Sequence, residues 1–398
     1  MCADAAGVQL LVDLSELVRT DARSGIQRAT RGVLAALLND SPPGVRVTPV
    51  YDAGGFYAHA PLPDAAGCMK TLPAGEEQPI RVAAGDIFFG LDLAPEQIPR
   101  NAAALASLKA HGVRLYFVVY DLLPALRPEW FFKGAQAWFT RWLEQVAQLA
   151  DGLICNAEAT ADQLLAWLEQ QPPARPDPLY VGCARLGADL GSAYPLYGLA
   201  EADQRVLDAV RQRPTFLMVG TLEPRKMHTE ALQACDLLWR EGIDVNLVIV
   251  GKPGWNTQAL AERLHRHPEA GTRLLWSERA SDELLVALYH EATALLAASA
   301  GEGFGLPLIE AAHYDLPVIA RDLPVFREVG GEHAWYFSGT GAPALAQALT
   351  DWLALHGVGQ APRSGAMPRL TWEQSAREFL HCMDGHWYAQ AVTRLACK

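Results

Sequence analysis

Ser299-Ala-Gly-Glu302-Gly-Phe-Gly305-Leu-Pro-Leu-Ile-Glu310 is the stretch of this sequence that best indicates the fold. The apolar residues 295–298 before it predict the end of a buried parallel strand. Pro307 stands where a helix is expected to begin, since the N–H that proline lacks is not needed there. A strand, a glycine-rich turn and a helix then follow one another. The backbone N–H groups that such a helix leaves unpaired at its N-terminus form a site for anions.

Two carboxylates accompany this turn. Glu302 lies in the loop and Glu310 lies about one turn into the predicted helix, so we expect both to face one crevice. Free N–H groups bind phosphate, and carboxylates accept hydrogen bonds from sugar hydroxyls, so the combination favours a sugar nucleotide as ligand. A strand, glycine loop and helix also occur in any doubly wound domain. Taken alone, the segment leaves that purely structural interpretation open.

The composition argues against several classes of protein. The 398 residues suffice for two domains, and a chain that is 50% hydrophobic and 20% charged is globular in composition. A net charge of −12 argues against a nucleic-acid-binding protein. Seven scattered cysteines without a Cys-x-x-C pair favour reduced thiols over disulfides or a zinc site. No apolar run of membrane-spanning length and no secretory signal is visible, so we expect a cytoplasmic protein.

Strand and helix patterns alternate along the chain in two series, which predicts an α/β fold with mostly parallel sheets covered on both faces. The first series of strands is expected at 8–13, 45–51, 86–90, 114–120 and 152–155, and the second at 215–220, 246–251, 273–276, 293–297 and 317–320. Between them, the sequence near 190–213 lacks clear periodicity and is interpreted as a linker. Ligands of such sheets bind at the carboxyl ends of the strands.

The spacing Glu302-x7-Glu310 resembles the Glu-x7-Glu motif of retaining glycosyltransferases of family 4, which have the GT-B architecture. Four further segments resemble that family in order and separation: 219–226, 250–255, 316–320 and 323–330. The resemblance implies two Rossmann-like, doubly wound parallel-sheet domains facing a cleft. The expected bounds are 1–195 for an acceptor-side domain, 196–213 for the linker and 214–375 for the nucleotide-sugar domain. A last helix at 376–398 is expected to cross back to the first domain.

The resemblance also implies roles for the two glutamates. Glu310 is expected to bind the ribose hydroxyls of the donor, and Glu302 is expected beside the transferred sugar. There its carboxylate could stabilise an oxocarbenium-like centre. The usual proposal for the family is a front-face mechanism, so Glu302 is assigned to donor binding and electrostatics and not to nucleophilic attack.

Arg225 and Lys226 follow the predicted strand 215–220 and suit a diphosphate, because Arg can bind two oxygens at once and Lys supplies a point charge. The family often has Arg where this chain has Thr221. The phosphate charge is therefore expected on this pair and on the helix N-terminus formed by Gly303, Phe304, Gly305 and Leu306. The alternative is a solvated basic pair on a loop.

Two further candidate segments lie in the first half. Asp121 follows the apolar strand 114–120 and is a candidate for contacting acceptor or donor sugar, with capping of the next turn as an equal alternative. Many relatives have His where this chain has Tyr120, so no histidine base is proposed. Gly25 permits close backbone approach to a phosphate and Arg28 is expected to face the cleft. A solvated helix start is the alternative for both.

Aromatic residues leave two questions open. Trp255 could pack beside the nucleotide base, but a lid over the core is preferred. The stretch 130–142 is aromatic and amphipathic, which favours core packing, with a membrane-facing or lipid-acceptor surface as the alternative.

The sequence thus predicts a hexosyltransferase that resembles bacterial mannosyl- or rhamnosyltransferases of surface polysaccharide and O-antigen synthesis. Its donor would be a GDP, dTDP or UDP sugar and its acceptor a glycan or lipid-linked oligosaccharide, with peripheral contact at the cytoplasmic membrane an open alternative. No cofactor and no metal are expected, because the histidines show no ligand spacing and the Asp-x-Asp signature is absent. The alternatives are a GT-B phosphorylase or epimerase, or a non-catalytic glycan-binding or scaffold subunit.

Overall fold

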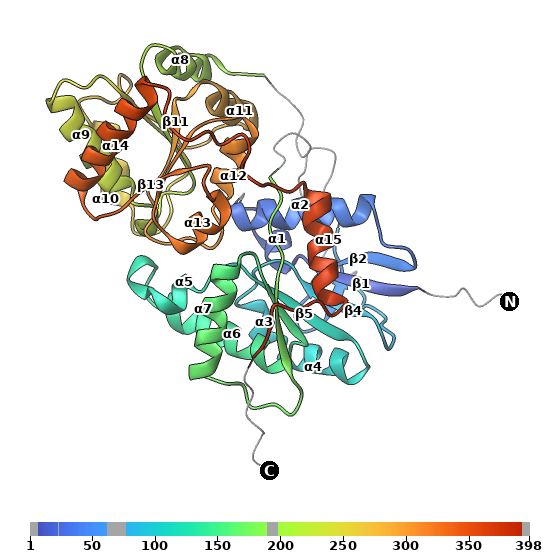
Figure 1. Cartoon of the computed structure of the whole chain (residues 1–398). Helices are drawn as coiled ribbons and strands as arrows, with labels where there is room; N and C mark the ends of the chain where they lie inside the picture. The colour runs from blue at the N-terminus through green and yellow to red at the C-terminus, as the bar shows by residue number, and fades with distance from the viewer. Residues whose placement is uncertain (1–6, 23, 62–76, 189–197, 392–398) are drawn as a thin grey trace. The chain divides into compact units, whose positions relative to one another are not determined.

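The computed structural model describes residues 7–22, 24–61, 77–188 and 198–391. The chain forms two compact units, which are considered separately (Figure 1). Unit 1 comprises residues 1–126, 133–187 and 370–398, and unit 2 comprises residues 127–132 and 188–369. In each unit, alternating strands and helices build one sheet with helices packed on its faces, which is the predicted α/β class.

The sheet of unit 1 has the strand order β14-β7-β6-β5-β4-β1-β2-β3. It is parallel throughout its centre, and the edge strands β14 and β3 pair antiparallel with their neighbours. The strands are β1 (Val8–Asp13), β2 (Val45–Asp52), β3 (Tyr57–His59), β4 (Ile87–Gly90), β5 (Arg114–Val119), β6 (Gly152–Cys155), β7 (Leu179–Cys183) and β14 (Ala389–Ala391). The helices are α1 (Ser15–Arg19), α2 (Gly25–Asn39), α3 (Gln97–Arg100), α4 (Ala102–Ala110), α5 (Leu123–Leu126), α6 (Ala135–Leu149), α7 (Glu158–Gln170) and α15 (Trp372–Met383).

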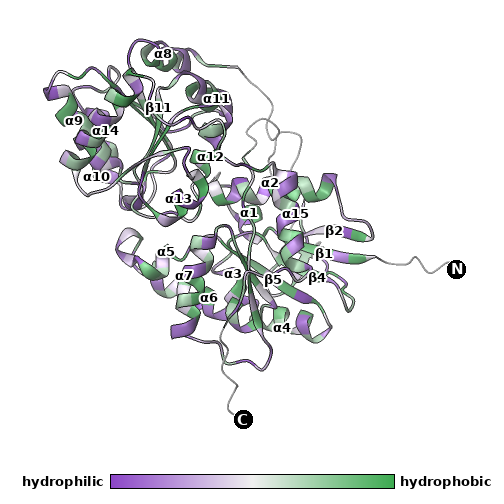
Figure 2. Ribbon diagram, viewed as in Figure 1, coloured by the Kyte–Doolittle hydropathy of each residue, from purple (hydrophilic) through white to green (hydrophobic). Residues whose placement is uncertain are grey.

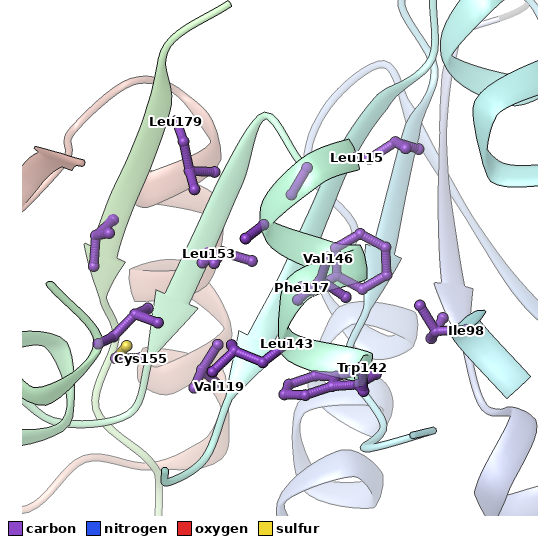
Figure 3. Packing of buried hydrophobic residues seen from close by; sticks show 14 of the residues in the cluster. Ile98, Leu115, Phe117, Val119, Trp142, Leu143, Val146, Leu153, Cys155 and Leu179 are labelled. Carbon is purple, nitrogen blue, oxygen red and sulfur yellow. The ribbon is translucent and has the colours of Figure 1, made fainter. Parts of the chain in front are cut away.

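Helix α6 covers the centre of this sheet. Figure 3 shows Trp142, Leu143 and Val146 of α6 lying over Phe117 of β5 and Leu153 of β6, and all five side chains are buried. The apolar positions of α6 therefore face the sheet, as the amphipathic pattern of residues 130–142 predicted for its core-packing alternative. That interpretation is correct for Phe139 and Trp142, which are each 1% exposed.

The C-terminal segment is part of unit 1. Helix α15 begins after Thr371, whose side chain caps it, and Trp372 packs on α2 at Gly32. A Cβ at Gly32 would lie 2.2 Å from the indole ring, so only glycine fits there. After α15 the chain pairs through β14 with β7. The unit boundary falls at Leu370 and not between 375 and 376, because the whole helix and its cap pack on unit 1; residues 392–398 lie outside the described residues.

The sheet of unit 2 has the order β10-β9-β8-β11-β12-β13 and is parallel. Its strands are coloured mainly hydrophobic in Figure 2, as expected for strands buried on both faces. They are β8 (Thr215–Val219), β9 (Asn246–Val250), β10 (Leu274–Ser277), β11 (Ala294–Ala297), β12 (Val318–Arg321) and β13 (Trp335–Phe337). The helices are α8 (Glu201–Val210), α9 (His228–Arg240), α10 (Gln258–Arg266), α11 (Asp282–Glu291), α12 (Leu306–His313), α13 (Pro324–Gly330) and α14 (Ala342–Gly357).

Two segments differ from the predicted domain bounds. Residues 201–210 of the predicted linker form α8, which belongs to unit 2 because Asn246 donates a hydrogen bond to its Ala209 carbonyl and α8 packs against α11. Linker residues 196 and 197 lie outside the described residues. Residues 127–132 belong to unit 2, although they were expected in the first domain. Phe131 stacks on Trp255 with ring centroids 5.5 Å apart, and the Trp255 indole donates to the Trp130 carbonyl at 2.8 Å.

In the part of the chain that the structure describes, no helix has the length and hydropathy needed to cross a membrane.

Candidate functional site

The candidate site lies in unit 2 at the carboxyl ends of β8 and β11, which are neighbours in the sheet. The loop after β8 carries Arg225 and Lys226, and the loop after β11 carries Glu302. Because the two strands are parallel and adjacent, their following loops meet at the same edge of the sheet. The Ala300 N–H donates to the Arg225 carbonyl at 2.8 Å and fixes one loop against the other.

Glu302 is the centre of this site. Its carboxylate accepts hydrogen bonds from Arg225 Nη1 at 2.7 Å, from Lys226 Nζ at 2.5 Å and from Ser299 Oγ at 2.7 Å. The Glu302 side chain is only 8% exposed, and those of Arg225 and Lys226 are 15% and 14% exposed. Arg225 also donates to Glu223 at 2.7 Å and to the Gly301 carbonyl at 3.1 Å. Arg225 is therefore held between Glu223 and Glu302, and Lys226 is held by Glu302.

The charges of these groups set the ionisation of Glu302. Burial alone would raise the pKa of this carboxyl, but Arg225 and Lys226, together with hydrogen bonds from Lys226 and Ser299, lower it to about 2. Glu302 is therefore a carboxylate at neutral pH. A negative group and two positive groups are present together in a site that excludes most water, where each interacts more strongly than in solvent.

The glycine-rich turn forms the start of α12. Gly305 precedes the helix with a φ of 96°, a backbone conformation that favours glycine, and a Cβ there would lie 2.8 Å from the Phe326 ring. The helix begins at Leu306, so Pro307 is its second residue and not its first. Gly303 and Phe304 are buried in the turn before it. The N-terminus of α12 therefore lies directly beside Glu302 in the sequence and carries the positive end of the helix dipole.

A small cavity of about 20 Å³ lies among these groups. Its polar lining is provided by Lys226, His228, Ser299 and Glu302, and its apolar lining includes Phe326 of α13. Gly305 and Pro307, at the start of α12, also line it. The volume holds about one water molecule, so the cavity marks the innermost part of the site.

Glu310 is held by a residue of α11. The residue is 2% exposed, and its Oε2 accepts a hydrogen bond from the Tyr289 hydroxyl of α11 at 2.6 Å. Glu310 is not among the residues that line the small cavity around Glu302. This contact fixes the carboxylate and leaves the expectation that both glutamates face one crevice as a prediction.

The three candidate residues of the first half lie in unit 1. Asp121 follows β5, and its Oδ1 accepts from the Leu123 N–H at 2.9 Å, so it caps the turn at α5, as one alternative predicted. Gly25 is the first residue of α2, Ser24 caps that helix by accepting from the Gln27 N–H at 3.3 Å, and Arg28 lies in the first turn. These contacts account for the local structure and leave the ligand-binding hypotheses for Asp121, Gly25 and Arg28 as predictions.

Sequence reasoning missed three side chains of this region. Ser299 belongs to the motif that opens with residue 299 but has no predicted role, and neither His228 nor Tyr289 is among the predicted site residues. His228 could have been found from its position two residues after Lys226, and Ser299 from its position just after β11. Tyr289 could not, because only the packing of α11 against α12 brings it to Glu310. Among the described residues, no group of His, Cys, Asp and Glu is arranged to hold a metal ion.

Comparison with known proteins shows what this chain is similar to. Residues 200–362 match the family model described as glycosyl transferases group 1. A crystal structure of Anabaena HepE in complex with UDP and glucose has a TM-score of 0.64 at 15% identity, covering 95% of this chain and 100% of that one. Sucrose-phosphate synthase from Thermosynechococcus elongatus has a TM-score of 0.57 at 18% identity, covering 94% of each chain. These two likenesses concern the fold, which is GT-B.

Over residues 200–362 the chain is similar to the group 1 glycosyltransferases. It is 44% identical over 379 residues to the serotype-specific mannosyltransferase WbdA of Escherichia coli. That alignment covers 94% of this chain and 46% of the relative, so the chain spans about half the length of the curated relatives that it matches.

Proposed function

We propose that this chain is a retaining hexosyltransferase that moves a mannose-like sugar from a nucleoside diphosphate to a hydroxyl of a glycan acceptor, without a metal ion. The observation that carries the proposal is the cluster of Arg225, Lys226 and Glu302 beside the N-terminus of α12. It combines cations for a diphosphate with a carboxylate for a developing positive charge. The likeness to a mannosyltransferase supports the choice of sugar.

The diphosphate is expected to bind Arg225, Lys226 and the N-terminus of α12. Arg225 offers planar donors and Lys226 a point charge, and the helix N-terminus favours negative charge. Two side-chain cations and a helix dipole supply the neutralisation that a divalent ion supplies in other transferases. The absence of a metal requirement is therefore proposed from the groups present.

Glu302 is expected to lie beside the transferred sugar. When the diphosphate takes over hydrogen bonds from Arg225 and Lys226, the carboxylate of Glu302 loses two partners and gains interaction energy with any positive charge nearby. Positive charge grows at the anomeric carbon as its bond to the phosphate oxygen breaks. On a front-face path the leaving phosphate oxygen accepts the proton of the acceptor hydroxyl, whose oxygen bonds the anomeric carbon on the same side. The configuration is then retained.

Glu310 is the proposed ribose contact. The Tyr289 hydroxyl donates to its Oε2 and holds the carboxylate in one orientation. A fixed orientation lowers the entropy lost when the nucleotide binds.

The chemical class of the acceptor is inferred from the activities of the similar proteins. The curated relatives include an E. coli O-antigen chain mannosyltransferase as well as WbdA, which supports a glycan or lipid-linked oligosaccharide of O-antigen synthesis. The free thiols of Cys155, Cys183, Cys235 and Cys382 support a reducing compartment, so we propose action in the cytoplasm, with peripheral contact at the membrane that carries the acceptor.

A donor panel tests the function. The chain is incubated with GDP-mannose, dTDP-rhamnose and UDP-glucose and a mannose-terminated oligosaccharide, and products are examined by mass spectrometry and by the anomeric proton signals in NMR. Transfer from one donor with the same configuration at the anomeric carbon is the expected result. Inverted product would overturn the retaining assignment. Binding of a glycan with no transfer and no donor hydrolysis would favour the scaffold alternative.

A further inference from the structure

His228 occupies an unusual position at the innermost part of the site. It is the first residue of α9 and follows Met227, which has a φ of 58°. His228 follows Lys226 by only two positions, but this backbone turn directs it into the interior of the unit, where it is 2% exposed. The ring lines the same cavity as Lys226, Ser299 and Glu302. Its Nδ1 is buried and has no hydrogen-bond partner among the described residues.

An unpartnered nitrogen at this depth is costly. Most buried polar side-chain atoms in proteins have a partner, and one that lacks it forfeits its hydration without compensation. The other polar side chains that line the cavity each have a hydrogen-bond partner, since Glu302 accepts from both Lys226 and Ser299. Nδ1 of His228, in contrast, is a buried polar atom of this cavity with no partner among the described residues.

The surroundings keep the ring neutral. Burial lowers the pKa of His228 to about 3, and the charges of Lys226 and Arg225 act in the same direction, while Glu302 opposes them. A neutral imidazole has one N–H to donate and does not repel the neighbouring cations. A ligand rich in acceptor oxygens would complete its hydrogen bonding, and phosphate oxygens are acceptors of that kind.

We infer that His228 is a further contact of the donor diphosphate, donating a hydrogen bond from a neutral ring next to the charged contacts of Arg225 and Lys226. The inference rests on the proposed function and goes beyond it by assigning a diphosphate contact that carries no charge. The two cations supply attraction, and the imidazole fixes the position of one oxygen through a directional bond.

Three variants separate hydrogen bonding from packing. His228→Leu removes both ring nitrogens at similar volume, His228→Asn keeps a polar atom near the position of Nδ1, and His228→Gln keeps one near Nε2. His267→Asn is the control, since His267 lies in the same unit with its Nε2 2.9 Å from Asp236 and does not line the cavity. Thermal unfolding of each variant without ligand shows whether it folds.

Calorimetry with the nucleoside diphosphate selected by the donor panel, with inorganic pyrophosphate and with the nucleoside alone decides the inference. We expect His228→Leu to weaken binding of both phosphate ligands by about tenfold or more, since a bond to a charged acceptor is lost. One of the two amide variants should retain most of the affinity, and nucleoside binding should stay unchanged. The His267→Asn control should bind all three ligands as wild type does.

Two results would overturn the inference. Wild-type affinity in all three His228 variants would show that water satisfies the ring, and equal losses for phosphate ligands and nucleoside would show a packing role. A wild-type chain that binds no nucleoside diphosphate contradicts the proposed function itself. If the wild type binds and Lys226→Ala weakens binding while the His228 variants do not, only the contact of His228 is wrong.

Discussion

Replacing Glu302 by Gln separates the electrostatic function of this residue from its structural one. The pKa of Glu302 is held at about 2 against an ordinary value of 4.5. At about 1.4 kcal/mol per pH unit, the folded state favours the ionised carboxylate by on the order of 3 kcal/mol. Because the folded pKa is depressed, this stabilisation is fully present above pH 4.5 and is lost as the pH falls toward 2.

The amide keeps the size of Glu302 and can still accept hydrogen bonds from Lys226 and Ser299, so part of the stabilisation survives. We expect the free energy of unfolding at pH 7 to fall by about 1–3 kcal/mol, and the acid dependence of stability between pH 4.5 and 2 to become flatter. Denaturant unfolding followed at several pH values measures both effects.

The same substitution should lower kcat without weakening the binding of the nucleoside diphosphate. Without a carboxylate beside the anomeric carbon, kcat should fall about a hundredfold, which corresponds to roughly 3 kcal/mol of lost transition-state stabilisation. Affinity for the nucleoside diphosphate should stay equal or rise, because Arg225 and Lys226 no longer have to leave an ionised partner. Steady-state kinetics at varied donor concentration measures the change in kcat, and calorimetry measures the change in affinity.

Glu223→Gln is the matched control. Glu223 accepts from Arg225 at 2.7 Å and is 8% exposed, but it does not line the cavity. It should lower stability without a hundredfold loss of kcat. Full turnover by the Glu302→Gln variant, or a tenfold loss of its diphosphate affinity, would refute the assignment of Glu302 to the reacting sugar.

Four further predictions follow from neighbouring contacts. Lys226→Ala should weaken nucleoside diphosphate binding about tenfold or more while changing thermal unfolding little, because Arg225 still holds Glu302; unchanged affinity in calorimetry would remove Lys226 from the site. Activity should survive EDTA, and activity lost to the chelator and restored by one divalent ion would contradict the metal-free proposal. Glu310→Gln should raise the donor KM more than it lowers kcat, since a ribose contact is present in ground and transition states alike, and kinetics showing only a kcat loss would exclude that role. Arg321→Met should lower the free energy of unfolding by about 3–5 kcal/mol in denaturant titrations, because it leaves buried Glu230 without the partner now 2.6 Å away, whereas a loss below 1 kcal/mol would show that this pair is dispensable.

Much of the fold follows from local pattern. Apolar runs such as 115–119 and 246–250 predict buried strands, and their alternation with helices fixes the α/β class before any contact is known. Gly305 needs its positive φ for the turn into α12, so the geometry of this helix start is also local. Arg225, Lys226 and Glu302 could be named from the sequence because each follows a strand end.

Only the tertiary structure shows to which unit a segment belongs and which distant residues it packs against. The first half was expected to hold residues 127–132, but Phe131 packs on Trp255, and a contact between residues 124 positions apart leaves no trace in local periodicity. The same reason applies to α15, because the packing of Trp372 on Gly32 joins segments about 340 residues apart.

The sequence by itself indicated the alternation of strands and helices, the Gly-rich helix start and the charges at the strand ends, because each depends on residues close together in the chain. Only the tertiary structure decided that Glu302 accepts hydrogen bonds from Arg225 and Lys226, that Glu310 accepts one from Tyr289, and that the ring of His228 is buried with no partner for Nδ1 among the described residues. Those facts depend on which side chains from distant segments fill the space around a given carboxylate or ring. Burial and neighbouring charge then set the pKa and hydrogen bonding of each group, and neither can be read from a motif.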